Sequence, residues 1–281
     1  MSDAMRPFPP LPETVRARYG VGPGDLALRS FGVRERDLHV DFARGPRPLV
    51  VTEVIACCTS TARDVAVDPE LIWQLPIGRR VECLLALLPP GPASNIDVSF
   101  RCGAGCAEES EIGISIDELT ELQSRAYASE HVAVPLESRA PVALRRPTGR
   151  DQLAWLSASP PDEAAAIRAM LETLIVGDDD RRAIDDWLSD AMLDRIGESM
   201  DEHDPLVGVT IGAVCPTCGA TNNVAIDVEE LALQRLYEAQ VALLSSVHRL
   251  ATHYHWTEQD IFATPHWRRQ HYLQLIEADQ R

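Results

Sequence analysis

Four cysteines in this chain have the residue type and spacing of a metal site. They form two pairs, Cys102-x3-Cys106 and Cys215-x2-Cys218. Each pair offers two thiolates, and four thiolates complete the ligand set of a tetrahedral structural zinc ion. We therefore predict that the pairs share one structural zinc ion per chain, although they lie far apart in the sequence.

Two other interpretations of these cysteines remain open. The four side chains could be reduced thiols in a fold that has lost its metal, or they could form a redox pair. A redox C-x-x-C is expected beside a β-α-β pattern, which this sequence does not show. The other cysteines, Cys57, Cys58 and Cys83, lie in apolar segments, which favours positions in a core rather than in a metal site.

The segments that must position the two cysteine pairs follow the same pattern. Ile114 and Ile226 lie eight residues after the second cysteine of their pairs, and a Glu-Leu dipeptide follows at twelve and thirteen residues, at 118–119 and 230–231. Alternating apolar residues predict a strand, and the acidic residue after it predicts the start of a helix. We expect a half-ribbon at about 96–116 and a second at about 206–228.

The fold class predicted from these patterns is α+β, mainly helical, with two pseudo-repeated zinc-ribbon-like β elements. Residues 1–48 are rich in proline and glycine and predict an extended arm. Residues 49–128 form an N-terminal helical module with the first half-ribbon. Residues 129–204 form a hairpin and an acidic helical segment, and residues 205–281 hold the second half-ribbon and a C-terminal helical block.

Within these regions, several local signals predict individual elements. We expect helices at 49–59 and 229–254, and a helix pair at 71–88 that is interrupted near 76–78. A capping box at Thr148–Asp151 starts a further helix, and apolar residues at helical spacing predict one continuous helix from 178 to 196. Short hairpins are expected near 38–40 and at 131–146.

Composition excludes several classes of protein. No run of about 18 apolar residues is present, so no membrane span is expected. Seven cysteines with C-x-x-C spacing and no signal peptide indicate a reducing cytoplasm rather than a disulfide scaffold. The net charge of −17 argues against nucleic acid as a partner, because phosphate binding needs a basic face.

Two surface features could contact a protein partner. Residues 162–204 hold fourteen acidic residues and four arginines, which indicates either a solvated helical face or a docking face for a basic partner. Trp267, Arg268 and Arg269 form a small basic and aromatic island in an acidic chain. We predict that these three residues bind a partner, with a DNA-binding helix-turn-helix as the alternative.

The sequence shows no pattern expected of an enzyme. The histidines near the C-terminus match no ligand or catalytic spacing, and they are His248, His253, His255, His266 and His271. No glycine-rich phosphate loop follows a strand, and no G-x-S-x-G nucleophile motif is present. We therefore predict a protein without enzymatic activity.

Two stretches of the chain resemble known families. The first includes Leu-Pro-Ile-Gly-Arg-Arg at 75–80, the first cysteine pair and Asp-Glu-Leu at 117–119. It is similar to the baseplate hub assembly proteins, or hub chaperones, of T-even-like contractile phage tails. The second includes 147–156, the Cys-Pro-Thr-Cys-Gly run at 215–219 and the tail at 253–273. It resembles zinc-ribbon proteins encoded with contractile phage tails and phage-tail-like injection systems.

This resemblance covers roughly residues 49–281 and implies a function. It implies a non-enzymatic assembly chaperone or accessory structural component, with baseplate, hub, spike or tube proteins as partners. The protein would act in the cytoplasm, and its incorporation into the finished particle stays open. The first cysteine pair departs from the pattern, since it is C-x3-C and lacks a proline.

Two alternative functions belong to other classes. One is a zinc-ribbon module associated with nucleic acid or transcription. The other is a metal-dependent hydrolase, which would need an open coordination position and a base that activates water.

Overall fold

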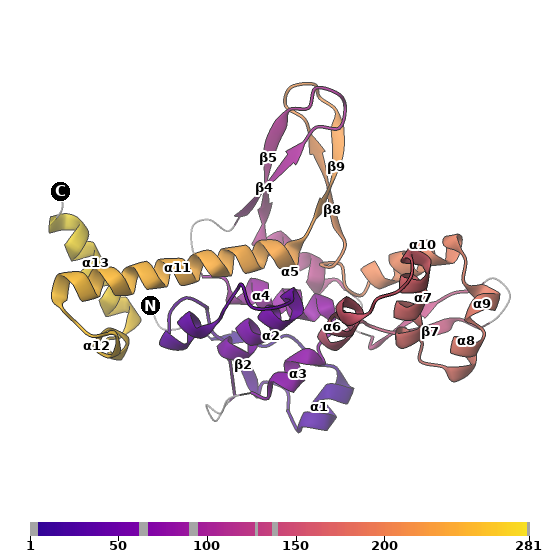
Figure 1. Ribbon diagram of the computed structural model, residues 1–281, viewed down its shortest axis with the longest axis horizontal. Coiled ribbons are helices and arrows are strands. Elements are labelled where there is room, and N and C mark those ends of the chain that lie inside the picture. Colours follow the sequence, from indigo (N-terminus) through magenta and orange to yellow (C-terminus); the bar gives the residue numbers. More distant parts are fainter. Residues whose placement is uncertain (1–4, 62–66, 90–94, 127–128, 137–139, 280–281) are drawn as a thin grey trace.

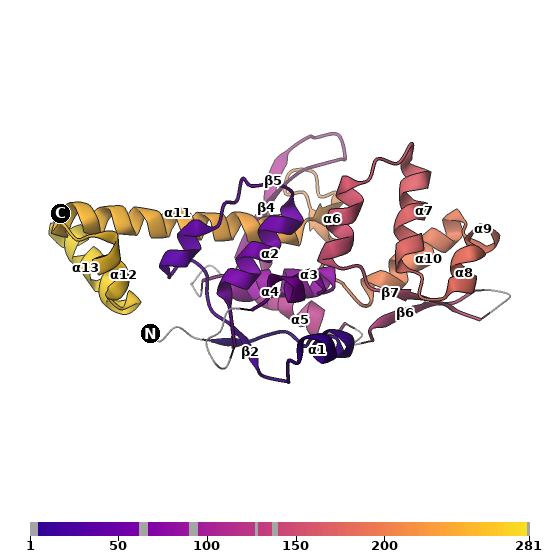
Figure 2. The same ribbon diagram turned by 60° about the horizontal axis from the view of Figure 1, so that its bottom comes forward.

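The computed structural model describes residues 5–61, 67–89, 95–126, 129–136 and 140–279 (Figure 1). Helices predominate in these residues, and the sheets are small and antiparallel. The prediction of a mainly helical α+β fold is therefore confirmed. Figures 1 and 2 show an elongated molecule, with a central body, a smaller helical module at one end and the C-terminal helices at the other.

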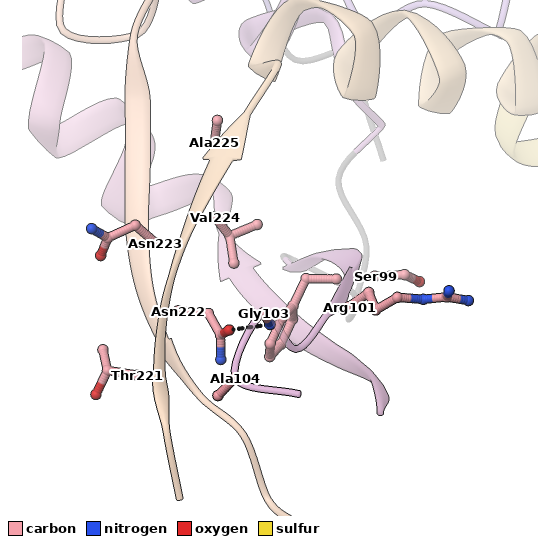
Figure 3. Close-up of a pocket in the computed structure, with 10 residues that line it drawn as sticks. Ser99, Arg101, Gly103, Ala104, Thr221, Asn222, Asn223, Val224 and Ala225 are labelled. Carbon is pink, nitrogen blue, oxygen red and sulfur yellow. Dashed lines mark hydrogen bonds between the residues drawn. The ribbon is translucent and has the colours of Figure 1, made fainter. Parts of the chain in front are cut away.

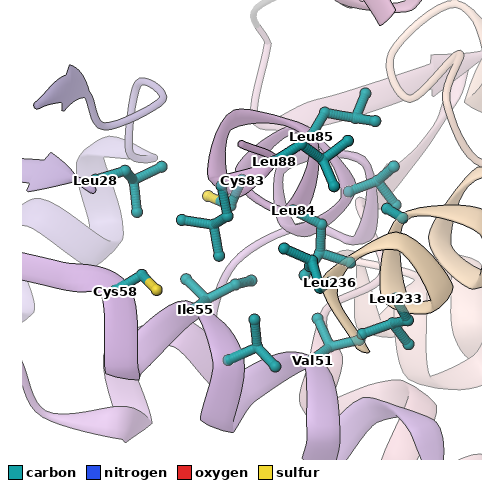
Figure 4. Packing of buried hydrophobic residues seen from close by; sticks show 14 of the residues in the cluster. Leu28, Val51, Ile55, Cys58, Cys83, Leu84, Leu85, Leu88, Leu233 and Leu236 are labelled. Carbon is teal, nitrogen blue, oxygen red and sulfur yellow. The ribbon is translucent and has the colours of Figure 1, made fainter. Parts of the chain in front are cut away.

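The helices of the central body point their apolar side chains into one shared core (Figure 4). They are α2 (Arg47–Cys58), α3 (Pro69–Trp73), α4 (Ile77–Leu87) and the first turns of α11 (Val228–Tyr254). Ile55 of α2, Leu84 of α4 and Leu236 of α11 are completely buried there. The interruption predicted near 76–78 is present, because Pro76 cannot continue the preceding helix and instead begins α4 as its N-cap residue.

The N-terminal residues differ from the prediction, because residues 5–48 are part of the central body and do not form an extended arm. Leu28 and Phe31 are completely buried in its core. The short elements here are β1 (Arg6–Pro7), α1 (Glu13–Tyr19), β2 (Leu26–Leu28) and the 3-10 helix η1 (Glu35–His39). Proline and glycine interrupt these elements, so the composition resembles that of an arm although the apolar residues between the interruptions are buried.

The strands of this region also differ from the prediction. β2 pairs with β1 on one side and with β3 (Thr59–Thr61) on the other, in an antiparallel sheet. No hairpin forms at 38–40, because these residues end η1 and lead away from it.

A second core lies in the module at one end of the molecule. The expected hairpin at 131–146 is present as β6 (His131–Val134) and β7 (Val142–Arg145). The helices of this module are α6 (Gly149–Ser157), α7 (Glu163–Leu174), α8 (Asp178–Arg182), α9 (Ile184–Trp187) and α10 (Asp190–Asp201). The continuous helix predicted from 178 to 196 is wrong: Ser189 is extended and caps α10, since its side chain accepts the N–H of Met192.

The C-terminal block is a third core, built around the far end of α11. The predicted long helix is confirmed, and it ends where His255 adopts a left-handed conformation. Two helices then fold back on α11, namely α12 (Glu258–Ala263) and α13 (His266–Asp279). Thr257 and Asp260 form a capping box that starts α12.

Two β-hairpins project together from the central body (Figure 1). They are β4 (Asn95–Arg101) with β5 (Glu109–Ser115), and β8 (Val209–Val214) with β9 (Thr221–Ile226). Ile114 and Ile226 are buried at their base, and alternate apolar residues further out are half-buried and pack against the central core, namely Val98, Ile112, Ile211 and Val224. A helix follows each hairpin, α5 (Ile116–Ser124) after the first and α11 after the second.

Candidate metal centre

The tips of the two hairpins carry the four cysteines. Cys102 and Cys106 lie between β4 and β5, and Cys215 and Cys218 lie between β8 and β9. The Sγ atom of Cys106 is 3.7 Å from that of Cys215 and 3.5 Å from that of Cys218, and the Cys102 and Cys218 sulfurs are 3.6 Å apart. All four sulfurs lie within 4.8 Å of one another. The structure therefore brings together the residues that the spacing predicts as ligands.

Backbone geometry in the two loops turns the cysteines toward one point. Gly105 and Gly219 have left-handed backbones, with φ values of 91° and 74°, a conformation that glycine adopts without steric cost. In the second loop, the N–H of Gly219 donates to the carbonyl of Cys215. These tight turns hold the two thiols of a pair on the same side of their loop.

A side chain outside the cysteine motifs also joins the two tips. The N–H of Gly103 donates to Oδ1 of Asn222 over 2.9 Å, which links the first loop to β9 (Figure 3). The Nδ2 group of Asn222 donates to the carbonyl of Ala220 within its own hairpin. Nothing in the sequence indicates this role, because an asparagine in a short polar run does not reveal a contact with a distant segment.

The sulfur positions fit a tetrahedral metal ion. A tetrahedral zinc ion with bonds of about 2.3 Å holds its sulfurs about 3.8 Å apart, and three of the sulfur–sulfur distances between the two hairpins are 3.5 to 3.7 Å. A disulfide would require about 2.05 Å, and all four cysteines are free thiols. Cys102 and Cys215 are buried, whereas Cys106 and Cys218 are exposed. Four soft thiolates in this arrangement suit zinc and other thiophilic ions.

The thiols of the cluster influence one another's protonation. The backbone N–H of Ala104 donates to the Cys102 sulfur and, together with the neighbouring thiols, lowers the pKa of Cys102 to about 7. The backbone of Glu108 favours the thiolate of Cys106, but the thiols of Cys102 and Cys218 outweigh it and raise the pKa of Cys106 to about 12. A metal ion must therefore displace protons as it binds.

A second group of possible ligands has a different explanation. The ligand atoms of Asp37, Cys57 and Cys58 lie within 4.8 Å of one another. Asp37, however, already accepts two hydrogen bonds from the guanidinium of Arg29, at 2.9 and 2.5 Å. A cation here would face that guanidinium, so we assign the group as a buried ion pair. Cys58 and Cys83 are completely buried, in agreement with the core positions expected for them, whereas Cys57 is half-buried at the edge of the central core.

The predicted partner-binding island is divided by the fold. Trp267 is 55% exposed, and Arg268 is exposed and donates to the hydroxyl of Tyr272. Arg269 is buried instead: it donates to the carbonyl of Val33 over 2.6 Å. Arg269 therefore attaches α13 to the central body, and only Trp267 and Arg268 of the three present their side chains to solvent.

Comparisons with known proteins give no relative for this chain. No family, no curated protein and no solved structure matches it. Within the described parts of the chain, every helix is too short or too polar to cross a membrane.

Proposed function

We propose that this chain is a non-enzymatic assembly chaperone or accessory structural component of a contractile phage tail or a phage-tail-like injection system. It would act on baseplate, hub, spike or tube proteins, in the reducing cytoplasm in which such particles assemble. The resemblance of residues 49–281 to hub chaperones and to zinc-ribbon proteins of these gene clusters supports the proposal. Incorporation of the chain into the finished particle is one of the two outcomes that the experiment below separates.

The observation that carries a structural role is the four-thiolate cluster between the two hairpins. We infer that it holds one zinc ion and that the hairpins are two pseudo-repeated zinc-ribbon-like elements. The chain supplies four ligands, so a tetrahedral ion keeps no position for water or substrate. Such an ion joins two distant segments, and its binding free energy contributes to folding. This favours a clamp over the catalytic metal of a hydrolase.

The charge of the chain favours proteins over nucleic acids as partners. The net charge is −17, and a surface of this sign repels a phosphate backbone. Residues 162–204, the acidic segment, hold fourteen acidic residues but only four arginines. Arg168, Arg181 and Arg182 form ion pairs with acidic residues of the same segment, and these pairs leave its acidic excess in place for a basic protein to meet.

Affinity purification from cells that assemble a contractile tail tests this proposal. We expect a tagged full-length chain to retain a hub, spike or tube subunit, identified by mass spectrometry. Cells that lack the tail gene cluster provide the control. Retention of nucleic acid, or of no tail component, would contradict the proposal. The same tag sought in purified particles distinguishes a chaperone that leaves from a component that stays.

A further inference from the structure

A groove runs along one side of the paired hairpins, between β5 and β8. It has a volume of about 450 Å³. A second groove of about 730 Å³ lies on the opposite side, between β4 and β9 (Figure 3). The two grooves have similar walls of backbone and small side chains, but their charges differ.

The strands that border the first groove have free edges. Each hairpin is a two-stranded sheet within the described residues, so the outer edges of β5 and β8 have no strand partner there. An exposed strand edge presents a row of backbone donors and acceptors that can pair with another extended segment. Val214, which also lines this groove, is 66% exposed, so an apolar contact is available beside the edge.

Acidic side chains line this groove and not the opposite one. Glu108, Glu109 and Glu111 contribute to it, and no basic side chain does so among its described lining residues. Glu109 forms an ion pair with Arg101 across the hairpin. Glu111 lies opposite Ser99 in the register of β4 and β5, so no basic residue of β4 compensates it directly.

The alternation of β5 specifies the pattern of a segment that would pair with it. Glu109 and Glu111 are exposed, whereas the alternate residues Ser110 and Ile112 are half-buried. Residues directly opposite one another on neighbouring strands share a face of the sheet. A strand added to β5 would therefore place basic side chains beside the two glutamates and small apolar side chains beside Ser110 and Ile112.

We propose that the groove between β5 and β8 binds a basic extended segment of a protein partner by strand addition to β5. The segment alternates basic with small apolar residues. A second copy of this chain does not fit, because its own β5 edge would place glutamates against glutamates, and like charges directly opposite destabilise a strand pair.

This inference specifies how the assembly partner of the proposed function would be held, and so rests on that function for its biological meaning. Its test needs no tail protein. A failed peptide experiment would leave the assembly proposal standing, and a failed affinity purification would leave the groove's binding properties unaffected.

Fluorescence anisotropy with a labelled peptide of alternating arginine and valine provides the test. We expect the full-length chain to bind this peptide and not to bind a peptide of alternating glutamate and valine. The Glu111→Arg variant should weaken binding about tenfold or more, because it replaces an attraction by a repulsion. The matched control is Glu118→Arg, which changes the net charge equally on the exposed start of α5 and should change affinity less than about twofold.

Backbone pairing is tested separately with the native chain. Methylating alternate backbone nitrogens of the arginine-valine peptide on its β5-facing edge should abolish binding, since those N–H groups can no longer donate. Three results would overturn the proposal: no binding of the alternating peptide, equal weakening by both charge variants, or undiminished binding of the methylated peptide. If the Glu111→Arg variant does not fold, the comparison of the methylated and unmethylated peptides on the native chain still tests the proposal.

Discussion

At the scale of single residues, the most consequential feature of the central body is the buried ion pair of Arg29 and Asp37. Both side chains are at most 1% exposed. Asp37 also accepts the backbone N–H groups of Val33 and Arg34. Burial opposes the ionisation of Asp37, but the hydrogen bonds and charge of Arg29 outweigh it and hold the pKa of this carboxyl below its usual value. The pair fixes the N-terminal segment against the end of α2.

We expect Asp37→Asn to lower the free energy of unfolding by about 3 kcal/mol at neutral pH, because Arg29 is left buried without a counter-charge. The folded pKa lies below the unfolded value of about 3.9, so the stability that this lowered pKa contributes is present in full above about pH 5 and is lost as pH falls through the folded pKa. Urea titrations at several pH values measure this. A variant as stable as the native chain at pH 7 would contradict the assignment.

The second prediction at this scale concerns the four cysteines that we propose as zinc ligands. Cys218→Ser should lose the metal and lower the melting temperature, because three remaining thiolates bind zinc far more weakly and the hairpin tips separate. Cys83→Ala is the control: Cys83 is completely buried in the central core, so its loss leaves a small cavity but retains the metal. Differential scanning fluorimetry and metal analysis record both quantities. Retention of metal by Cys218→Ser would count against the four-thiolate site.

At the scale of elements, the junction between α4 and α6 depends on one glycine. The guanidinium of Arg80 is buried and donates to the carbonyls of Ile72 and Pro48. Gly149, the first residue of α6, lies directly against it, since a Cβ added there would be 2.5 Å from Cζ of Arg80. The absence of a side chain at residue 149 therefore allows α6 to approach α4.

Gly149→Ala should destabilise the chain by about 2 kcal/mol, the usual cost of overpacking. Gly197→Ala is the matched control, because Gly197 lies inside α10 and a Cβ there meets nothing within 4 Å. That change should stabilise the chain by about 0.5 to 1 kcal/mol, since alanine favours a helix. Chemical denaturation measures the free energy of unfolding of both variants. Destabilisation of equal size in both would refute the steric explanation.

The attachment of α13 to the central body also depends on one side chain. Arg269 reaches the carbonyl of Val33 and lies over the ring of Phe262. Arg269→Gln should increase hydrogen exchange in α12 and α13 about tenfold or more, since a charge-assisted hydrogen bond is lost. Arg268→Gln should leave exchange nearly unchanged, because Arg268 is exposed. Equal exchange in the two variants would show that Arg269 has no such role.

At the scale of the whole molecule, local signals were more predictable than long-range contacts. The helix starting at Thr148 and the long helix α11 follow from capping residues and periodicity, which are local properties. The buried N-terminal segment was not predictable, because its short elements acquire their stability from contacts with α2 and α4. The clustering of the four cysteines was predictable from their spacing, whereas the Asn222 contact depends on how two distant hairpins face each other.

The three hydrophobic cores lie along one elongated molecule, and the paired hairpins stand on its central body (Figure 1). The first hairpin leads into α5 and the second into α11, which extends to the C-terminal block. A metal ion between the hairpin tips would therefore tie the N-terminal half of the chain to the helix that carries its C-terminal block. Removal of the metal ion should therefore destabilise the contact between the two hairpins. The module of β6, β7 and α7 to α10 should be less affected, because it has a hydrophobic core of its own.

The most direct test of this account is the zinc content per chain, measured by native mass spectrometry on full-length protein purified without added metal. The account predicts one zinc ion per monomer in the native chain and none in a Cys102→Ser, Cys218→Ser double variant. A native chain without zinc that unfolds cooperatively with four reduced thiols, or one zinc ion per two chains, would contradict an intramolecular clamp.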